Sequence, residues 1–167
     1  IGAISFTDEI KVIDNIRSKY GNHIEIRVDA NGAFNMEEAI EKLYILKKYN
    51  IHSIEQPLKK DDVENYKELC GMKIIPIGLD EELIGKVSYD EKRNLIEYIK
   101  PDYVILKPSL LGGYRSCNEW IEVANKNFCG WWITSALESN IGLNAIAQWT
   151  YTLNTKIPQG LGTGSLY

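Results

Sequence analysis

The sequence lacks several features that would decide its class at once. Basic residues are not in excess, because 23 acidic side chains outnumber 19 basic ones and the net charge is −4. The charges are interspersed rather than gathered in runs, so no basic patch for nucleic acid is expected. No apolar run approaches the roughly 18 residues of a membrane-spanning helix, and no signal-peptide pattern is present. These absences favour one ordinary globular domain, or part of a larger one.

Cysteine is scarce, and a dinucleotide fingerprint is missing. The cysteines are odd in number and have no metal-binding or redox spacing; they are Cys70, Cys117 and Cys129. Free, buried or half-buried thiols in a reducing cytoplasm are therefore expected. No G-x-G-x-x-G motif follows an early strand. The "GLGTG" stretch at 160–164 comes after the last predicted helix, where a dinucleotide-binding loop does not belong.

Strand-like and helix-like patterns alternate along the whole chain. The strand-like segments are 24–30, 52–57, 74–80, 102–108 and 131–137. The helix-like segments are 7–20, 35–50, 61–71, 86–99, 114–126 and 141–153. In the first strand Ile24, Ile26 and Val28 fall on one face and charged residues on the other. Strict alternation predicts an α/β fold with a parallel sheet and right-handed crossovers.

The spacing of the strands indicates which parallel fold this is. One residue at the carboxyl end of each strand marks the repeat: Asp29, Glu55, Asp80, Lys107 and Ser135. Successive markers are 26, 25, 27 and 28 residues apart. Near-constant units with short loops favour a barrel over a doubly wound sheet. In such a barrel the active site lies at the carboxyl ends of the strands.

Acidic residues end three consecutive strands and should meet at one mouth. Asp29, Glu55 and Asp80 have no histidine or cysteine beside them, so they are hard oxygen ligands that suit Mg²⁺. The alternative for "GLDEEL" at 78–83 is a solvated acidic helix start. Lys107 ends the next strand, where a lysine is usually a solvated charge. An Asp, Glu, Asp, Lys order on four successive tips nevertheless predicts a metal-dependent site.

Five motifs connect this pattern to a known family. They are "VDANGAF", "IEQP", "GLDEEL", "LKPSLLGG" and "SALESNIGL". In this order and spacing the chain resembles the enolase superfamily, and within it the o-succinylbenzoate synthases of menaquinone biosynthesis, over essentially its whole length. The resemblance implies a modified (β/α)7β TIM-like barrel behind an N-terminal capping domain. It also implies one Mg²⁺ held by Asp29, Glu55 and Asp80.

The implied reaction is that of a lyase. It is the Mg²⁺-dependent syn dehydration of 2-succinyl-6-hydroxy-2,4-cyclohexadiene-1-carboxylate to 2-succinylbenzoate through an enediolate. The resemblance gives Lys107 the task of stabilising the intermediate through its charge. It places substrate contacts at Ser135, Ala136, Gly162 and Thr163. Asn31, two residues past Asp29, could reach a metal-bound water or the substrate. Asn31 is equally well explained as a turn residue, and the glycines of 160–164 as a plain flexible loop. Glu81 and Glu82 are expected to cap the next helix or orient Lys107.

The family's base has no counterpart in the sequence. In the family it is the second lysine of a K-x-K pair, on the strand that precedes the first helix found here. Because the chain begins at Ile1, we expect the capping domain, the first barrel strands and this pair to lie outside it. Residues 1–167 are then an incomplete C-terminal barrel domain that is inactive alone. Its expected partners are a small-molecule carboxylate substrate and the missing N-terminal portion of the same enzyme.

Two other functions stay open. Dipeptide epimerases and N-acylamino-acid racemases of the same superfamily keep the three acids and use a lysine on each side of the substrate. The metal site cannot separate them from the synthase. Proline directly after Lys107 favours the synthase, as does the lack of an acidic D-x-D pattern near "GTGSLY". The third possibility is a barrel fragment with a binding or structural role and no catalysis.

Overall fold

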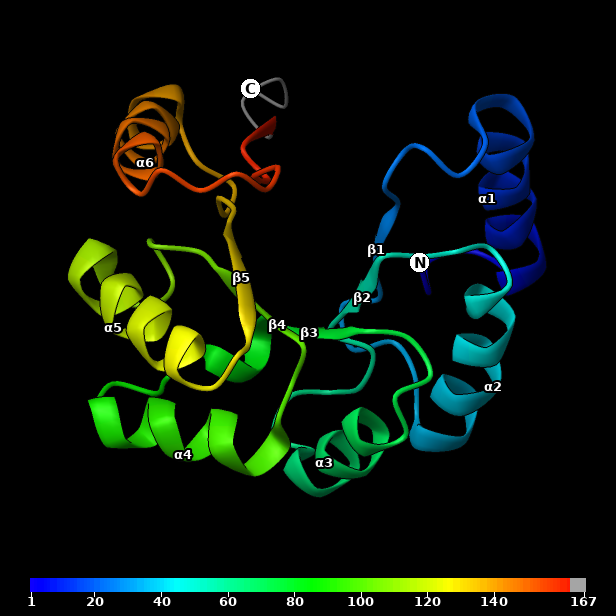
Figure 1. The fold of residues 1–167 in the computed structure, drawn as a ribbon, viewed down its shortest axis with the longest axis horizontal. Helices are drawn as coiled ribbons and strands as arrows, with labels where there is room; N and C mark the ends of the chain where they lie inside the picture. The colour runs from blue at the N-terminus through cyan, green and yellow to red at the C-terminus, as the bar shows by residue number, and fades with distance from the viewer. Residues whose placement is uncertain (163–167) are drawn as a thin grey trace. The chain divides into compact units, whose positions relative to one another are not determined.

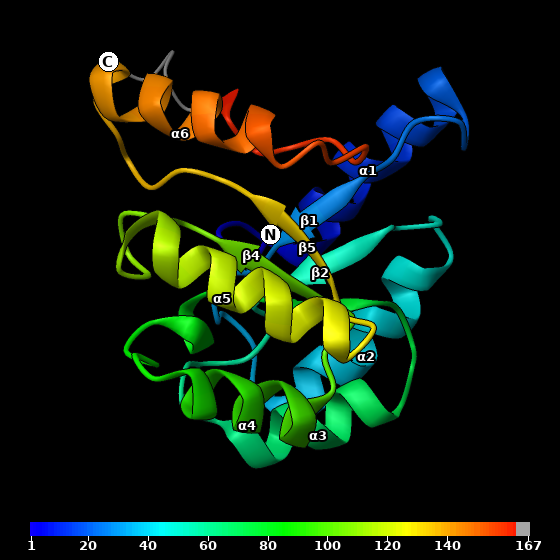
Figure 2. The same ribbon diagram turned by 60° about the vertical axis from the view of Figure 1, so that its left-hand side comes forward.

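The computed structural model of the chain describes residues 1–162. These residues form two compact units, each of which is considered by itself. The first unit holds Ile1–Glu82 together with Tyr98–Asp102, and the second holds Leu83–Glu97 and the chain from Tyr103 onwards. In both units, helices follow parallel strands in alternation (Figures 1 and 2).

The first unit is a parallel α/β arrangement. Its elements are α1 (Phe6–Tyr20), β1 (Arg27–Asp29), α2 (Met36–Lys47), β2 (Ser53–Glu55), α3 (Val63–Gly71) and β3 (Ile77–Leu79). β2 lies between β1 and β3, and all three strands are parallel. The register sets Asp29 beside Glu55 and Glu55 beside Gly78. Strands in sequential order with a helix between them are what right-handed crossovers produce.

A row of buried apolar side chains lies on one face of this sheet, although burial alternates along the strand only in β1. Val28, Ile54 and Ile77 stand at corresponding positions of the three strands and are buried. Buried apolar side chains of the helices complete the core; they include Leu43, Leu46, Tyr66 and Leu69. Successive side chains of a strand point to opposite faces. The carboxylates of Asp29 and Glu55 therefore point to the face opposite Val28 and Ile54.

The second unit continues the alternation. Its elements are η1, a single 3₁₀ turn (Glu81–Leu83) that leads into it, α4 (Tyr89–Ile99), β4 (Tyr103–Leu106), α5 (Gly113–Lys126), β5 (Gly130–Ile133) and α6 (Asn140–Thr152). The last two residues of α4 belong to the first unit. β4 and β5 are parallel, with Leu106 beside Ile133. Helix α5 packs against both strands.

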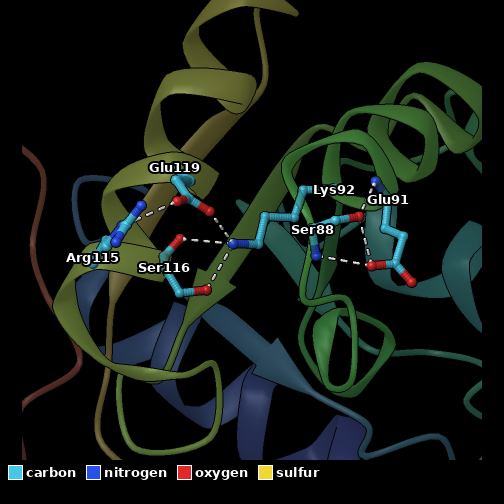
Figure 3. Close-up of polar contacts among 6 residues, drawn as sticks. All are labelled: Ser88, Glu91, Lys92, Arg115, Ser116 and Glu119. Atoms are coloured by element: carbon cyan, nitrogen blue, oxygen red, sulfur yellow. Dashed lines mark hydrogen bonds and ion pairs between the residues drawn. The ribbon is translucent and has the colours of Figure 1, made fainter.

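Side chains that precede the helices fix where they begin. Asn35 accepts a hydrogen bond from the Glu38 N–H at 2.9 Å, and the Glu38 carboxylate accepts one from the Asn35 N–H at 3.1 Å. This capping box makes Asn35 the N-cap of α2. Ser88 and Glu91 form the same reciprocal pair before α4, with the Ser88 N–H 2.8 Å from Glu91 Oε2 (Figure 3).

A buried ion pair joins α4 to α5. Lys92 of α4 is fully buried, and its Nζ lies 2.6 Å from Glu119 Oε2 and 2.8 Å from Ser116 Oγ (Figure 3). Both partners are on α5. Arg115 stands on the outer side of Glu119, with its Nε 3.7 Å from Glu119 Oε1. The pair fixes how the two helices pack, because a buried ammonium needs these acceptors.

The glycine-rich segment near the end of the described chain packs against β5. Gly160 donates its N–H to the Ile133 carbonyl at 2.8 Å and accepts from Thr134 Oγ1 at 2.7 Å. A Cβ at Gly160 would stand 2.8 Å from Thr134 Oγ1, so glycine is what permits this close approach. The glycine at 160 therefore has a packing role here, next to the end of a strand.

Every predicted helix and strand is present within residues 1–162, although the strands are shorter than expected. The first strand was expected over 24–30 and covers Arg27–Asp29, the residues in register with Ser53–Glu55 of β2. The predicted free and buried state of the thiols is confirmed for Cys70, Cys117 and Cys129. Across the described part of the chain, no helix combines the length and the apolar character needed to cross a membrane.

Candidate active site

The three predicted metal ligands lie at the carboxyl ends of the strands of the first unit. Asp29 and Glu55 are the last residues of β1 and β2 and are register partners. Asp80 directly follows Leu79, the last residue of β3. The partner of Glu55 on β3 is Gly78, and Asp80 stands two residues further along, which is the same face in an extended chain. The backbone therefore presents all three acids on one face at one end of the sheet.

The three acids differ in their surroundings. Asp80 is 2% exposed, whereas Asp29 and Glu55 are half-buried. Asp29 Oδ1 accepts a hydrogen bond from the Asn31 N–H at 2.9 Å, so the turn after β1 orients this carboxylate. Asn31 adopts a left-handed φ of 46°. The turn, one of its two predicted roles, is therefore present.

The carboxyl groups do not gather into a metal-binding cluster as they stand. Among the residues that the structure describes, no three His, Cys, Asp or Glu side chains lie close enough together to hold one ion. Carboxylates on one face repel each other unless a cation lies between them. Without a cation, this repulsion keeps the carboxylate oxygens apart. The donor chemistry and the backbone placement fit Mg²⁺. The convergence of the oxygens stays a prediction.

Glu82 has a partner that the sequence did not predict. Its carboxylate is fully buried, and Oε2 accepts a hydrogen bond from the Asp61 N–H at 2.8 Å. Asp61 lies in the loop between β2 and α3, so Glu82 ties this loop to the segment that follows β3. The expectation that Glu81 and Glu82 cap the following α-helix is wrong. Helix α4 begins only at Tyr89, and the two glutamates form the η1 turn instead.

A small open cavity adjoins the ends of β1 and β2. Its volume is about 230 Å³, and it is lined by Asn31, Gly32, Gln56, Lys59, Lys60 and Glu81. Because two lysines and one glutamate are among its lining residues, the lining carries a net positive charge. It therefore suits an anionic group close to the predicted metal ligands.

Lys107 follows β4 in the second unit. It is half-buried, and its carbonyl accepts hydrogen bonds from the N–H groups of Leu110 at 2.9 Å and Leu111 at 3.1 Å. These bonds shape the turn that leads into α5. Tyr103 shares the face of β4 with Lys107 by alternation, and its ring packs on that of Trp132 with centroids 5.2 Å apart. The side chain of Lys107 therefore extends from the end of a strand whose neighbouring aromatic side chains are packed together.

The remaining predicted substrate contacts follow β5 or lie in the last loop. Thr134 continues the register of β5 with β4, and Ser135 stands one residue further on. Ser135 is buried and Ala136 half-buried. Gly162 is exposed, and Thr163 lies outside the described residues. Contact of these residues with a substrate stays a prediction.

Comparison with known proteins identifies the family. Residues 1–163 match the enolase C-terminal domain-like family. The chain belongs to this family. Membership confirms the resemblance inferred from the motifs of the strand ends. It also agrees with the observed α/β architecture, in which parallel strands alternate with helices.

Relatives of this enolase-family chain have defined activities. An o-succinylbenzoate synthase from Desulfotalea psychrophila is 48% identical over 168 residues, which cover 100% of this chain and 45% of that protein. The crystal structure of MenC from the same organism has a TM-score of 0.92 at 47% identity and covers 98% of this chain and 46% of the other. An L-Ala-D/L-amino acid epimerase from Flavobacterium johnsoniae is 29% identical over 84% of this chain and 40% of its own. The chain thus spans less than half the length of these relatives.

Proposed function

We propose that the protein containing this chain is an o-succinylbenzoate synthase. The reaction is the dehydration of 2-succinyl-6-hydroxy-2,4-cyclohexadiene-1-carboxylate to 2-succinylbenzoate. The observation that carries the proposal is the placement of Asp29, Glu55 and Asp80 on one face at consecutive strand ends. It is supported by 48% identity over the whole chain to a protein with this activity.

The proposal gives each site residue a task. Asp29, Glu55 and Asp80 would hold Mg²⁺ through their carboxylate oxygens. When bound, Mg²⁺ supplies a fixed positive charge beside the substrate carboxylate, which makes removal of the neighbouring proton feasible. Lys107 would place its ammonium near the negative charge that develops on the substrate. Asn31 would help to orient the substrate carboxylate at the end of β1.

The substrate's succinyl side chain is proposed to meet Ser135 and Ala136, partly through backbone amides. Gly162 and Thr163 are the other two proposed substrate contacts, in a loop whose glycines would let the backbone approach the substrate. Residues 1–167 contain no K-x-K pair. We therefore propose that the remaining portion of the enzyme supplies the base, along with the capping domain. Residues 1–167 would then form part of a C-terminal (β/α)7β barrel domain. Buried free thiols suit the reducing cytoplasm in which we place the reaction.

The test is a dehydration assay on the full-length protein. Formation of the aromatic product is followed by its ultraviolet absorbance with Mg²⁺, after EDTA treatment, and after Mg²⁺ is added back. We expect turnover that EDTA abolishes and Mg²⁺ restores. Absence of turnover in the Mg²⁺-loaded protein would contradict the assignment and favour a non-catalytic role.

Dipeptide epimerisation or N-acylamino-acid racemisation is the second candidate, because one relative with 29% identity is an epimerase. Both activities exchange the substrate α-proton with solvent. Incubation of L-Ala-L-Glu and of N-succinyl amino acids in D₂O, followed by NMR, detects that exchange directly. We expect exchange to be slow compared with dehydration. The reverse order would make the epimerase or racemase activity the principal one.

A further inference from the structure

Gln56 stands between the predicted metal ligands and has no role in the proposed chemistry. It directly follows Glu55 at the end of β2, and it is 1% exposed. Its φ is 41°, in the left-handed region, although it is not glycine and it precedes Pro57. The position before proline normally favours extended backbone. Such a conformation persists only where the surrounding contacts hold it.

The side chain of Gln56 holds the segment after β3. Its Oε1 accepts hydrogen bonds from the N–H groups of Asp80 at 3.0 Å and Glu82 at 3.4 Å. Its Nε2 donates to the Leu58 carbonyl at 3.3 Å. Asp80 lies beyond the last residue of β3, so a side chain satisfies its N–H in place of a neighbouring strand. The backbone of a predicted metal ligand is thereby fixed by Gln56.

The main chain of Gln56 reaches the other two strand ends. Its N–H donates to the Gly78 carbonyl at 2.9 Å, which extends the pairing of β2 with β3. Its carbonyl accepts from the Gly32 N–H at 2.7 Å, in the turn that follows Asp29. One buried residue therefore contacts all three segments that carry the acids. The contacts involve both its backbone and its amide side chain.

We propose that Gln56 is a positioning residue that holds the ends of β1, β2 and β3 in the arrangement that the metal requires. The inference deepens the proposed function and rests on it for the identity of the metal. Gln56 does not contact the metal in this scheme. It acts through the backbone of Asp80 and through the turn that orients Asp29. Residues that orient metal ligands typically change metal affinity roughly 10- to 100-fold when they are replaced.

The test compares Gln56→Leu with Ser53→Ala in the full-length protein. Leucine keeps the approximate volume but removes the acceptor for the Asp80 and Glu82 amides. Ser53 is the matched control, because it is a buried polar residue on the same strand at the opposite end. Mg²⁺ affinity is measured by calorimetry and global stability by urea unfolding. We expect a roughly 10- to 100-fold loss of affinity in Gln56→Leu and no loss in Ser53→Ala.

Hydrogen exchange separates this inference from the proposed function. In the metal-free protein, the Asp80 and Glu82 amides should exchange at least 10-fold faster in Gln56→Leu than in the wild type. If the wild type binds no Mg²⁺, the metal assignment fails and the exchange result still decides the role of Gln56. Unchanged exchange at both amides, or unchanged Mg²⁺ affinity in a protein that binds it, overturns the inference. If Gln56→Leu does not fold, Gln56→Asn takes its place, because its shorter amide cannot reach Asp80.

Discussion

Lys92 Nζ lies 2.6 Å from Glu119 Oε2, and the two side chains differ sharply in exposure: 0% for Lys92 and 30% for Glu119. Replacing Lys92 and replacing Glu119 should therefore change the stability of the protein by different amounts. Removing Glu119 leaves a buried ammonium without its carboxylate partner, in contact with Ser116 and the ring of Trp120. Removing Lys92 leaves a carboxylate that water already reaches. The loss in free energy of unfolding when the pair is broken therefore depends on which of the two residues is replaced.

We expect Glu119→Gln to lower the free energy of unfolding by roughly 3 kcal/mol, and Lys92→Met to lower it by clearly less. Urea unfolding of both variants and of the double variant measures the difference. Glu122→Gln is the matched control, because Glu122 pairs with Lys126 on the same helix at 2.7 Å with both side chains largely exposed. That variant should unfold almost as the wild type does. Equal losses for Glu119→Gln and Glu122→Gln would contradict the asymmetry.

The thiols of Cys70 and Cys117 should be nearly inert in the folded protein. Burial raises the pKa of both thiols to about 12. Only the thiolate reacts, so at pH 8 their rates with a disulfide reagent should fall roughly a thousand-fold below that of a free cysteine. The reaction is followed by absorbance in native buffer and in denaturant, where all the cysteines should react at once. Fast native labelling at Cys70 or Cys117, located by mass spectrometry, would refute the expectation.

His52 should make stability depend on pH. Burial lowers the pKa of His52 below its ordinary value, and the nearby Glu25 carboxylate opposes this only in part. The unfolded chain therefore binds more protons just below pH ~6.5, and the free energy of unfolding falls as the pH falls through that range. His52→Gln should flatten this slope. An unchanged slope in His52→Gln would exclude the assignment to His52.

The sequence predicts the order of helices and strands and the positions of the acids, because both follow from local periodicity and repeat spacing. It does not reveal the role of Gln56, whose side chain bonds to amides 24 and 26 residues away. Lys92 lies in the charged run "DEKRN", which is typical of a solvated helix face. Its burial depends on Glu119, 27 residues later. Long-range polar partners of this kind leave no periodic signal.

Asp80 and Lys107 should affect different steps if the proposed roles are correct. Asp80→Asn removes one of three negative charges from the predicted metal site, so we expect it to weaken Mg²⁺ binding first. Lys107→Ala leaves the three carboxylates intact, so its Mg²⁺ affinity should stay close to that of the wild type. Its dehydration rate should fall by at least about 100-fold, because a positive charge near the developing anion is lost. Calorimetry measures the first quantity and the absorbance assay the second, both on the full-length protein.

Two further variants sharpen the test of Lys107. Lys107→Arg keeps the charge but carries it on a larger planar group, so it should recover little of the lost rate. Lys19→Ala removes an exposed lysine from α1 and serves as the control for a simple change in net charge. It should leave turnover and Mg²⁺ affinity unchanged. Near-normal dehydration by Lys107→Ala would show that the end of β4 does not belong to the active site. Loss of Mg²⁺ affinity in that variant would show that Lys107 acts on the metal ligands rather than on the substrate.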